Sequence, residues 1–262
     1  MLQKKFFTLL FFSTLLFAEK LPFFFSGNEH FSERELYEAL YFHKPYFYEF
    51  YLDDPAIDPK TLMLLKQTLE DYYKSKGFFH AKITPEQDAK RIVFAIEEGE
   101  PVLVASVTND SELATEELIP FETGALFDAE KFTQSKEAIK FFYGEQNYCN
   151  PALEAKAWID SELNKAFLFY KSRKNGSCIF GNIKVAPTQN IDEALLRSLL
   201  YLEQGAPFSL KDIDTSYRSL YSYEGISKAT IQTQVDANNS VDVSVVVEEN
   251  EKPIRLELGV GA

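Results

Sequence analysis

Gly124-Ala125-Leu126-Phe127-Asp128 recurs 81 residues later as Gly205-Ala206-Pro207-Phe208-Ser209, and this repeated pentapeptide decides how the chain is organised. Each copy ends on a residue that favours the N-cap of a helix, and apolar residues at helical spacing follow it. A strand-like run and a short helix precede each copy, and two strand-like runs follow each helix. Because internal repeats take precedence over local signals, we interpret the chain as repeated strand-helix-helix-strand-strand units.

A third, weaker unit precedes these two. Its helices are indicated by the capping box Ser32-Glu33-Arg34-Glu35 and by Asp58-Pro59, an N-cap followed by proline at the first helical position. Gly77, Asn147 and Gly225 take the helix-stop position of the three units. The sequence therefore predicts an α+β fold of three tandem β-α-α-β-β domains, each a three-stranded mixed sheet covered by two helices. The predicted bounds are 19–100, 101–178 and 179–252.

The two ends of the chain carry patterns of a different kind. Lys4 and Lys5 precede an apolar run that is too short for a membrane helix, so residues 1–18 are expected to be a secretory signal cleaved near Ala18. An uncleaved anchor is the alternative. Residues 253–262 alternate apolar with polar or tiny side chains, as the first strand of a membrane barrel does, so we expect them to be such a strand, truncated before its barrel.

Composition and motifs argue against nucleic-acid binding, metal binding and catalysis. A net charge of −13 disfavours nucleic-acid binding, which needs an excess of Lys and Arg. His30, His43 and His80 lack the spacing of metal ligands. The acidic pairs Glu97-Glu98, Glu116-Glu117 and Glu248-Glu249 are interpreted as solvated faces or helix-dipole partners rather than catalytic carboxylates. With no phosphate-binding or nucleophile motif, we predict no enzyme, no metal and no cofactor.

Cys149 and Cys178 are the two cysteines of the chain. They lie just before and just after the predicted hairpin of the second unit, which brings its two ends side by side. In an exported protein this placement favours a disulfide within that unit. Two buried free thiols are the alternative.

The order of the motifs resembles the POTRA domains of the BamA/TamA superfamily of outer-membrane assembly proteins. The resemblance rests on Gly27-Asn28 after the first strand, the Tyr73–Phe79 junction, the Phe94–Pro101 strand ending and the Leu256–Gly261 segment. Three units are most similar to the TamA branch. The resemblance implies a periplasmic arm at the outer membrane that receives unfolded outer-membrane proteins, with a TamB-like inner-membrane partner on domain 1. An arm of a two-partner-secretion transporter and an inner-membrane-anchored POTRA scaffold are the alternatives; the residues do not favour a periplasmic enzyme.

The resemblance also places the second strand of each unit at a sheet edge, where unpaired backbone groups can accept a strand from another chain. The candidate strands are 78–83, 152–159 and 226–233. The third has little charge and no proline, so we expect it to be the least protected and expect Thr230→Pro to weaken client pairing. The predicted partner-binding residues are Phe78, Phe79, Ala81, Ile83, Ile226, Ala229, Ile231 and Thr233.

An aromatic run in the first unit contains Tyr46, Phe47, Tyr48 and Tyr51. Such clusters usually belong to a hydrophobic core, and burial is the favoured interpretation here. The alternative is an exposed docking patch for the partner of domain 1.

Overall fold

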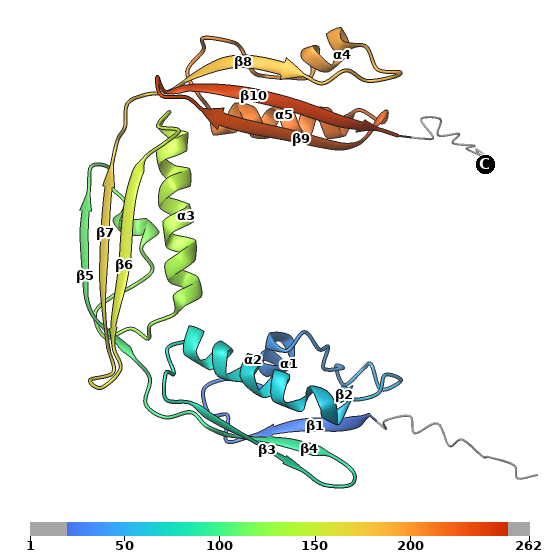
Figure 1. The fold of residues 1–262 in the computed structure, drawn as a ribbon, viewed down its shortest axis with the longest axis vertical. Coiled ribbons are helices and arrows are strands. Elements are labelled where there is room, and N and C mark those ends of the chain that lie inside the picture. Colours follow the sequence, from blue (N-terminus) through green and yellow to red (C-terminus); the bar gives the residue numbers. More distant parts are fainter. Residues whose placement is uncertain (1–19, 251–262) are drawn as a thin grey trace, which may run out of the picture. The chain divides into compact units, whose positions relative to one another are not determined.

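The computed structural model describes residues 20–250. The predicted signal peptide and the predicted barrel strand both lie outside the described residues. The chain divides into two compact units, 1–102 and 103–262, and each is described by itself. The first unit holds one β-α-α-β-β repeat and the second unit holds two, as the colours along the chain show in Figure 1. The predicted α+β fold of three repeats is confirmed.

The first repeat packs its helices on a mixed sheet. Strand β4 is central, parallel to β1 and antiparallel to β3, in the order β2-β1-β4-β3. Phe23 of β1 and Phe94 of β4 are completely buried, and burying each ring contributes roughly 2–3 kcal/mol. The elements are β1 Leu21–Ser26, α1 Glu33–Ala39, β2 Ala56–Ile57, the 3₁₀ turn η1 Pro59–Thr61, α2 Leu62–Ser75, β3 Lys82–Gln87 and β4 Ile92–Glu97.

This sheet has four strands, whereas three were predicted. The additional strand β2 has two residues and pairs antiparallel with the start of β1. A pair of residues is too short to show any periodicity in the sequence. The predicted caps are present: Ser32 and Glu35 form the capping box of α1, and the Asp58 carboxylate accepts a hydrogen bond from the backbone of Lys60.

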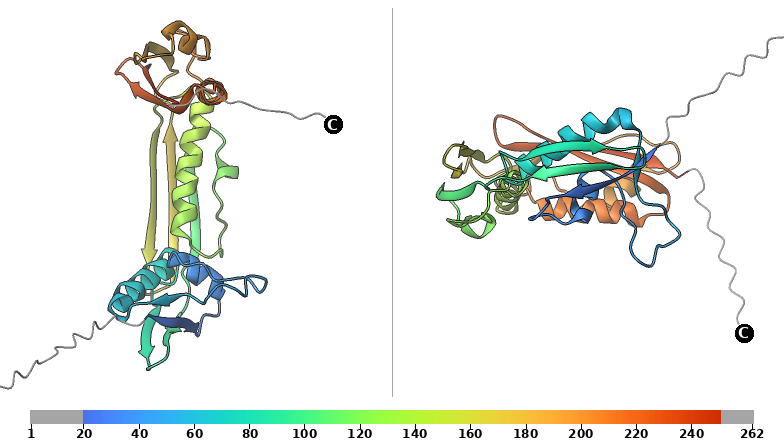
Figure 2. Two further views of the ribbon diagram at one scale, coloured as in Figure 1. Left: turned by 90° about the vertical axis from the view of Figure 1, so that its right-hand side faces the viewer. Right: turned by 90° about the horizontal axis from the view of Figure 1, so that it is seen from below.

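The second repeat has one long helix on one face of its sheet, which Figures 1 and 2 show from two sides. Strand β7 is central, in the order β5-β7-β6. Asp128 caps the helix as predicted. The first predicted helix is only a 3₁₀ turn, so the expectation of two helices is wrong here. The elements are β5 Leu103–Ser111, η2 Glu116–Leu118, α3 Ala129–Glu145, β6 Ala152–Asp160 and β7 Lys165–Arg173.

The third repeat repeats this topology with two helices, and its strand order is β8-β10-β9. Gly77 and Asn147 have the predicted left-handed conformation after their helices, but Gly225 does not. Helix α5 ends at Ser222, and Tyr223 already has an extended conformation. The elements are β8 Ile179–Val185, α4 Glu193–Ser198, α5 Leu210–Ser222, β9 Ile226–Val235 and β10 Ser240–Glu249.

The repeated pentapeptide covers the outer edge of the first strand in its repeat. The Val104 amide donates to the Ala125 carbonyl at 2.8 Å, and the Phe180 amide donates to the Ala206 carbonyl at the same distance. In the first repeat, Pro55-Ala56-Ile57-Asp58 does the same beside β1, because the Phe23 amide donates to the Pro55 carbonyl. The first repeat therefore has the same entry to its second helix, with Asp54 and Pro55 in place of the glycine and alanine.

Candidate interaction surfaces

Each repeat leaves one terminal strand of its sheet as a candidate for accepting another chain. These strands are β3, β6 and β9, each the first strand of its hairpin and the second strand of the predicted β-α-α-β-β unit, as the resemblance implied. The opposite edge is covered at its start by β2 or by the pentapeptide. The three terminal strands differ in how many outward backbone groups they offer.

Strand β3 is a poor acceptor. It begins at Lys82, so the predicted residues Phe78, Phe79 and Ala81 lie before it; Phe78 is completely buried in the core. Pro85 pairs with Phe94 of the central strand without having an N–H to donate. The alternation of an antiparallel ladder then puts the outward backbone groups at Ile83, Pro85 and Gln87, and the proline interrupts that row.

Strand β9 is protected, contrary to the prediction that it is the least protected edge. The hydroxyl of Tyr217 accepts a hydrogen bond from the Ile231 amide at 2.8 Å and donates to the Ile231 carbonyl at 3.1 Å. The hydroxyl of Tyr221 serves the amide and carbonyl of Ala229 in the same way, at 3.2 and 3.3 Å. Both tyrosines come from α5, which lies beside this strand. Their hydroxyls occupy the groups that an added strand would need.

The same hydrogen bonds correct the expectation for Thr230→Pro. Because Ala229 and Ile231 direct their backbone groups outward, Thr230 directs its own toward Val246 of the central strand. Proline at position 230 would therefore break a bond inside the sheet. Of the other predicted residues, the Ile226 side chain is buried and Thr233 is exposed beyond the two tyrosines.

Strand β6 is the most accessible edge in the part of the chain that the structure describes. It is nine residues long, contains no proline and pairs with β7 along its whole length. Within residues 20–250, no side chain is bonded to its backbone amides or carbonyls. Every second residue of β6 therefore presents an unpaired N–H and C=O.

The sheet face beside β6 carries exposed apolar side chains. Ala166, Leu168 and Tyr170 of β7 are buried toward α3, so Phe167 and Phe169 point to the opposite face, which no described helix of this repeat covers. Trp158 lies directly opposite Phe167 and is 73% exposed. We call this face the apolar shelf; its members are Leu103, Leu126, Trp158, Phe167 and Phe169.

A second exposed surface is the aromatic loop, residues 41–52 of the first repeat. The favoured interpretation of a core cluster is wrong: Phe47 is 93% exposed, Phe50 88% and Tyr51 73%. Tyr46 and Tyr48 are partly exposed and stack on each other with their rings 5.2 Å apart. The loop therefore presents its aromatic rings to solvent.

Polar contacts hold this loop in one conformation. The Glu49 carboxylate accepts hydrogen bonds from the Tyr46 amide at 2.7 Å and from the His43 ring at 2.9 Å. The Tyr46 amide is the main cause that lowers the pKa of Glu49. The Arg34 guanidinium lies 3.8 Å above the Tyr46 ring and donates to the Lys44 carbonyl, while the Lys44 ammonium pairs with Asp54. The exposed rings are thus displayed by an ordered scaffold.

Two of the acidic pairs have a structural role that the sequence did not indicate. In the first repeat, the buried Glu98 carboxylate accepts from the His30 amide, lies 2.5 Å from the His30 ring nitrogen and accepts from the Tyr73 hydroxyl at 3.0 Å. In the third repeat, the Glu249 carboxylate accepts from the amides of Gln189 and Asn190 at 2.8 and 2.7 Å. In both repeats, the second glutamate of the acidic pair at the end of the central strand binds the loop that follows the first strand of the repeat.

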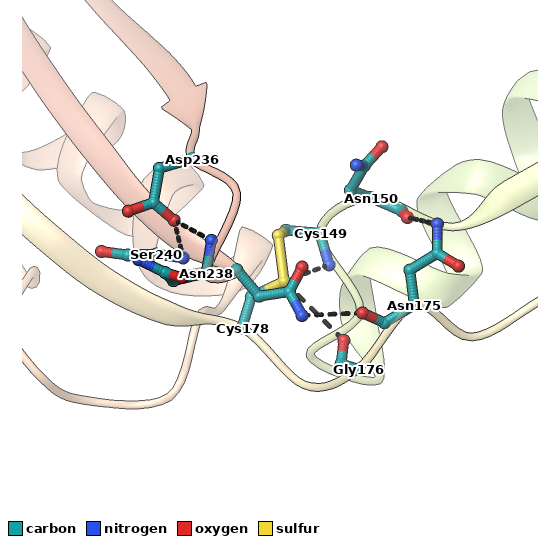
Figure 3. Close-up of a disulfide and its surroundings, with 9 residues drawn as sticks. Cys149, Asn150, Asn175, Gly176, Cys178, Asp236, Asn238 and Ser240 are labelled. Atoms are coloured by element: carbon teal, nitrogen blue, oxygen red, sulfur yellow. Dashed lines mark hydrogen bonds between the residues drawn. A yellow bond between two sulfur atoms is a disulfide. The ribbon is translucent and has the colours of Figure 1, made fainter.

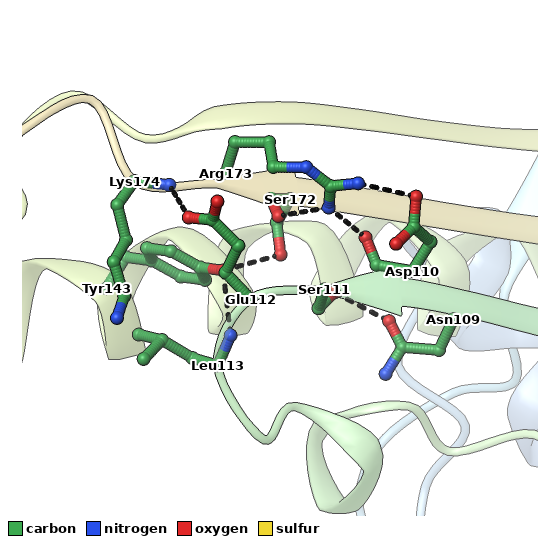
Figure 4. Close-up of polar contacts among 9 residues, drawn as sticks. All are labelled: Asn109, Asp110, Ser111, Glu112, Leu113, Tyr143, Ser172, Arg173 and Lys174. Carbon is green, nitrogen blue, oxygen red and sulfur yellow. Dashed lines mark hydrogen bonds and ion pairs between the residues drawn. The ribbon is translucent and has the colours of Figure 1, made fainter.

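The second repeat replaces this acid with hydroxyl groups. Tyr143, which corresponds to Tyr73, lies 2.8 Å from the Ser172 hydroxyl and accepts from the Leu113 amide at 3.3 Å (Figure 4). At the same end, the Arg173 guanidinium pairs with Asp110, and that contact raises its pKa. The three repeats therefore fasten the same loop with different side chains.

Cys149 and Cys178 form a disulfide (Figure 3). Cys178 is buried in the core of the third repeat, so the bond joins the second repeat to the third rather than lying wholly within the second. The Cys178 amide also donates to the Asn147 carbonyl at 2.8 Å, and the Asn239 side chain donates to the Asn175 carbonyl at 2.7 Å. These contacts fasten the junction.

Residues 20–250 contain no group of three or more potential metal ligands. His30 and His43 each contact a glutamate, Glu98 and Glu49 respectively. In the same residues no helix has both the length and the apolar character needed to cross a membrane.

A family model described as POTRA, surface antigen variable number repeat, matches three segments of the chain, residues 23–99, 105–171 and 179–250. A search of curated proteins found no match.

Among solved structures, the chain is similar to a Haemophilus influenzae BamA fragment of POTRA domains 3–5, with 17% identity and a TM-score of 0.59. The match covers 88% of this chain and 96% of the fragment. POTRA domains 1–3 of Omp85 from Anabaena match with 12% identity, a TM-score of 0.33, and coverage of 89% and 96%. CdiB from Escherichia coli matches with 13% identity, a TM-score of 0.29, and coverage of 71% and 33%. At these identities the similarity to the BamA fragment shows the fold alone.

Proposed function

The chain belongs to the POTRA family, and we therefore propose that it is the periplasmic arm of an outer-membrane assembly factor, which binds extended segments of client proteins and delivers them to a membrane β-barrel. The clients are unfolded outer-membrane proteins. Assignment to the TamA branch is part of this proposal and is supported by the three repeats within the chain. The proposed action is non-covalent and needs no cofactor. An arm of a two-partner-secretion transporter and an anchored POTRA scaffold are the competing functions.

The observation that carries the proposal is the unobstructed edge of β6. Among the three terminal strands, β3 is interrupted by Pro85 and β9 is covered by the hydroxyls of Tyr217 and Tyr221. Strand β6 has nine residues, about 30 Å of backbone at the usual rise per residue, and could pair with a full strand of a client. Main-chain hydrogen bonds would give affinity without requiring one client sequence, which suits a protein that receives many clients.

Two proline variants test this edge. The variants are Ala155→Pro and Lys156→Pro. The N–H groups of these neighbours point to opposite sides of β6, so proline removes an outward donor at one position and a hydrogen bond to β7 at the other. We expect the variant that keeps the thermal unfolding midpoint of wild type to bind a labelled ten-residue strand peptide at least several-fold more weakly, measured by fluorescence anisotropy. Unchanged binding by that folded variant would overturn the proposed edge.

We also propose that the aromatic loop binds a protein partner of domain 1, a TamB-like inner-membrane protein. The supporting observation is the exposure of Phe47 and Phe50 on an ordered loop, because aromatic side chains displayed in this way are typical anchors of protein interfaces. An acidic residue follows the loop directly: Asp53 forms no ion pair within the described residues, whereas Lys44 is paired with Asp54. The complementary surface is an apolar groove with a basic rim.

The double variant Phe47→Ser and Phe50→Ser tests the loop. Both rings are solvent-exposed, so the thermal unfolding midpoint should stay close to that of wild type. Photo-crosslinking from position 51 to the inner-membrane fraction should lose its specific product in the variant. The same crosslinked product in both proteins would exclude the aromatic loop as the docking surface.

A further inference from the structure

We propose that the apolar shelf selects which segments pair with β6, so that strands with apolar side chains at every second position are preferred. This inference rests on the proposed addition of a strand to the β6 edge and specifies its ligand: an amphipathic strand of the kind that builds a membrane barrel. Trp158 is the side chain that makes the selection.

The position of Trp158 follows from the register of the sheet. It projects from the terminal strand itself, directly opposite Phe167 of the central strand, and its side chain is 73% exposed. A strand added to β6 would place one residue directly opposite Trp158, with Cβ atoms roughly 4.5–5.5 Å apart. An apolar residue there would cover the indole that now faces water, because same-face neighbours across a ladder contact each other.

The shelf continues from Trp158 across the sheet. Phe167 is 40% exposed and Leu103 is 42% exposed, and Leu103 pairs in turn with Leu126 of the repeated pentapeptide. Phe167 itself pairs with Ser106 of β5, and Leu103 pairs with Lys165, so Leu103 and Leu126 lie further along this face rather than directly beside Phe167. An added strand would place one more side chain beside the pair of Trp158 and Phe167. Only every second residue of that strand would face the apolar shelf, since successive side chains of a strand point to opposite faces.

The charges on β6 favour an amphipathic ligand strand over a purely polar one. Glu154 and Lys156 share the face of Trp158 and neutralise each other at 2.6 Å, and this pairing lowers the pKa of Glu154. Glu154 and Lys156 therefore leave no net charge between them on the strand that carries the indole. What remains to recognise a ligand is the backbone row and the aromatic surface, and an amphipathic strand satisfies both.

Two labelled ten-residue peptides provide the test. One alternates Val or Tyr with Ser or Thr; the other has Thr, Ser and Gln throughout, so its backbone can pair but neither face is apolar. We expect wild type to bind the first about tenfold more tightly, which corresponds to covering one aromatic side chain. Trp158→Ala should reduce that affinity to the level of the polar peptide and leave the polar peptide unaffected. Tyr201→Ala, at an exposed tyrosine of the third repeat, is the matched control and should change neither affinity.

The outcomes separate the two proposals. If neither peptide binds wild type, strand addition at β6 is wrong and the inference falls with it. If both peptides bind equally, or if Trp158→Ala weakens both alike, strand addition stands and selection by the shelf is wrong. If sedimentation shows that wild type dimerises and Trp158→Ala abolishes the dimer, a second copy of the chain covers the shelf, which also overturns the inference.

Discussion

The hydroxyl oxygen of Tyr217 lies 2.8 Å from the amide nitrogen of Ile231 and 3.1 Å from its carbonyl oxygen. One side chain therefore satisfies both outward backbone groups of a residue in the terminal strand β9. Tyr221, one helical turn further along α5, repeats the arrangement at Ala229. Natural sheets often cover an exposed edge with a helix, and here side chains of the helix also hydrogen-bond the outward backbone groups of the edge strand.

Replacing Tyr217 and Tyr221 together by phenylalanine should open the β9 edge. We expect a loss of stability of roughly 1 kcal/mol per hydroxyl, measured by urea unfolding, because its hydrogen bonds to β9 are lost and the ring is no longer held at the edge. The freed edge should also bind the amphipathic strand peptide through a second site. Tyr201→Phe is the control, since its ring is exposed in the same repeat. A double variant with one peptide site and wild-type stability would show that the hydroxyls protect nothing.

Gly27 and Gly124 form a matched pair for separating backbone strain from steric overlap. Both have positive φ, +80° and +88°. A Cβ at Gly27 would overlap the Ile96 carbonyl of the central strand, whereas one at Gly124 meets nothing within 4 Å. We expect Gly124→Ala to cost about 1 kcal/mol from strain, and Gly27→Ala to cost at least about 2 kcal/mol more. Hydrogen exchange of the amides in β1 and β7 measures the two effects, and equal costs would contradict this account.

Local signals in the sequence predicted the order of the elements and most helix starts. Ser32, Asp128 and Ser209 cap helices as expected, because an N-cap depends on a few neighbouring residues. The two-residue strand β2 could not be predicted, since it exists only through its pairing with β1. Asp54 and Pro55 stand where the pentapeptide has glycine and alanine, and this difference hid the third copy of that motif.

The candidate site was harder to predict than the fold. Tyr217 and Tyr221 belong to the residues at helical spacing that follow the second pentapeptide, but periodicity cannot show that their hydroxyl groups bond to the backbone of β9. The aromatic loop was expected in the core because such residues are usually buried. Its exposure depends on Glu49 holding Tyr46 and His43, a contact set by the loop conformation rather than by composition. No sequence signal separates β6 from the other two terminal strands, because the obstruction of β9 comes from hydroxyl groups of α5 that only the folded chain brings to that edge.

Glu98→Ala should destabilise the first repeat. The buried carboxylate binds the amide and ring of His30 and the hydroxyl of Tyr73, and burial together with Glu98 raises the pKa of Tyr73. Removing it leaves these groups without their partner, at a cost of roughly 2–3 kcal/mol. Calorimetry of the first unit measures the loss. Glu97→Ala, at the exposed neighbour, should be close to neutral; similar losses for both variants would refute the proposed role.

Glu249 should make the third repeat sensitive to acid. Hydrogen bonds from the backbone of Asn190 lower its pKa below the usual 4.5 in the folded state. A lowered folded pKa gives stability that is present above pH 4.5 and is lost as the pH falls through the folded pKa. The difference in melting temperature between wild type and Glu249→Gln should therefore be constant near neutral pH and shrink below pH 4.5. A difference that grows on acidification would contradict the assignment.

Breaking the disulfide should destabilise the second and third repeats and spare the first. Cys149 and Cys178 are 29 residues apart, and closing a loop of that length contributes roughly 3–4 kcal/mol on the chain-entropy model. The single tryptophan of the chain, Trp158, lies in the second repeat, so its fluorescence during urea unfolding reports on the linked pair. The double variant Cys149→Ala and Cys178→Ala should unfold at lower urea concentration, and wild type treated with a reductant should have a similar unfolding midpoint.

The remaining difference between these two midpoints measures the cavity left by the buried Cys178 side chain. Hydrogen exchange in β1 and β4 should stay unchanged, because those strands belong to the other unit. If reduction leaves the tryptophan-monitored midpoint where it was, the bond does not stabilise the junction.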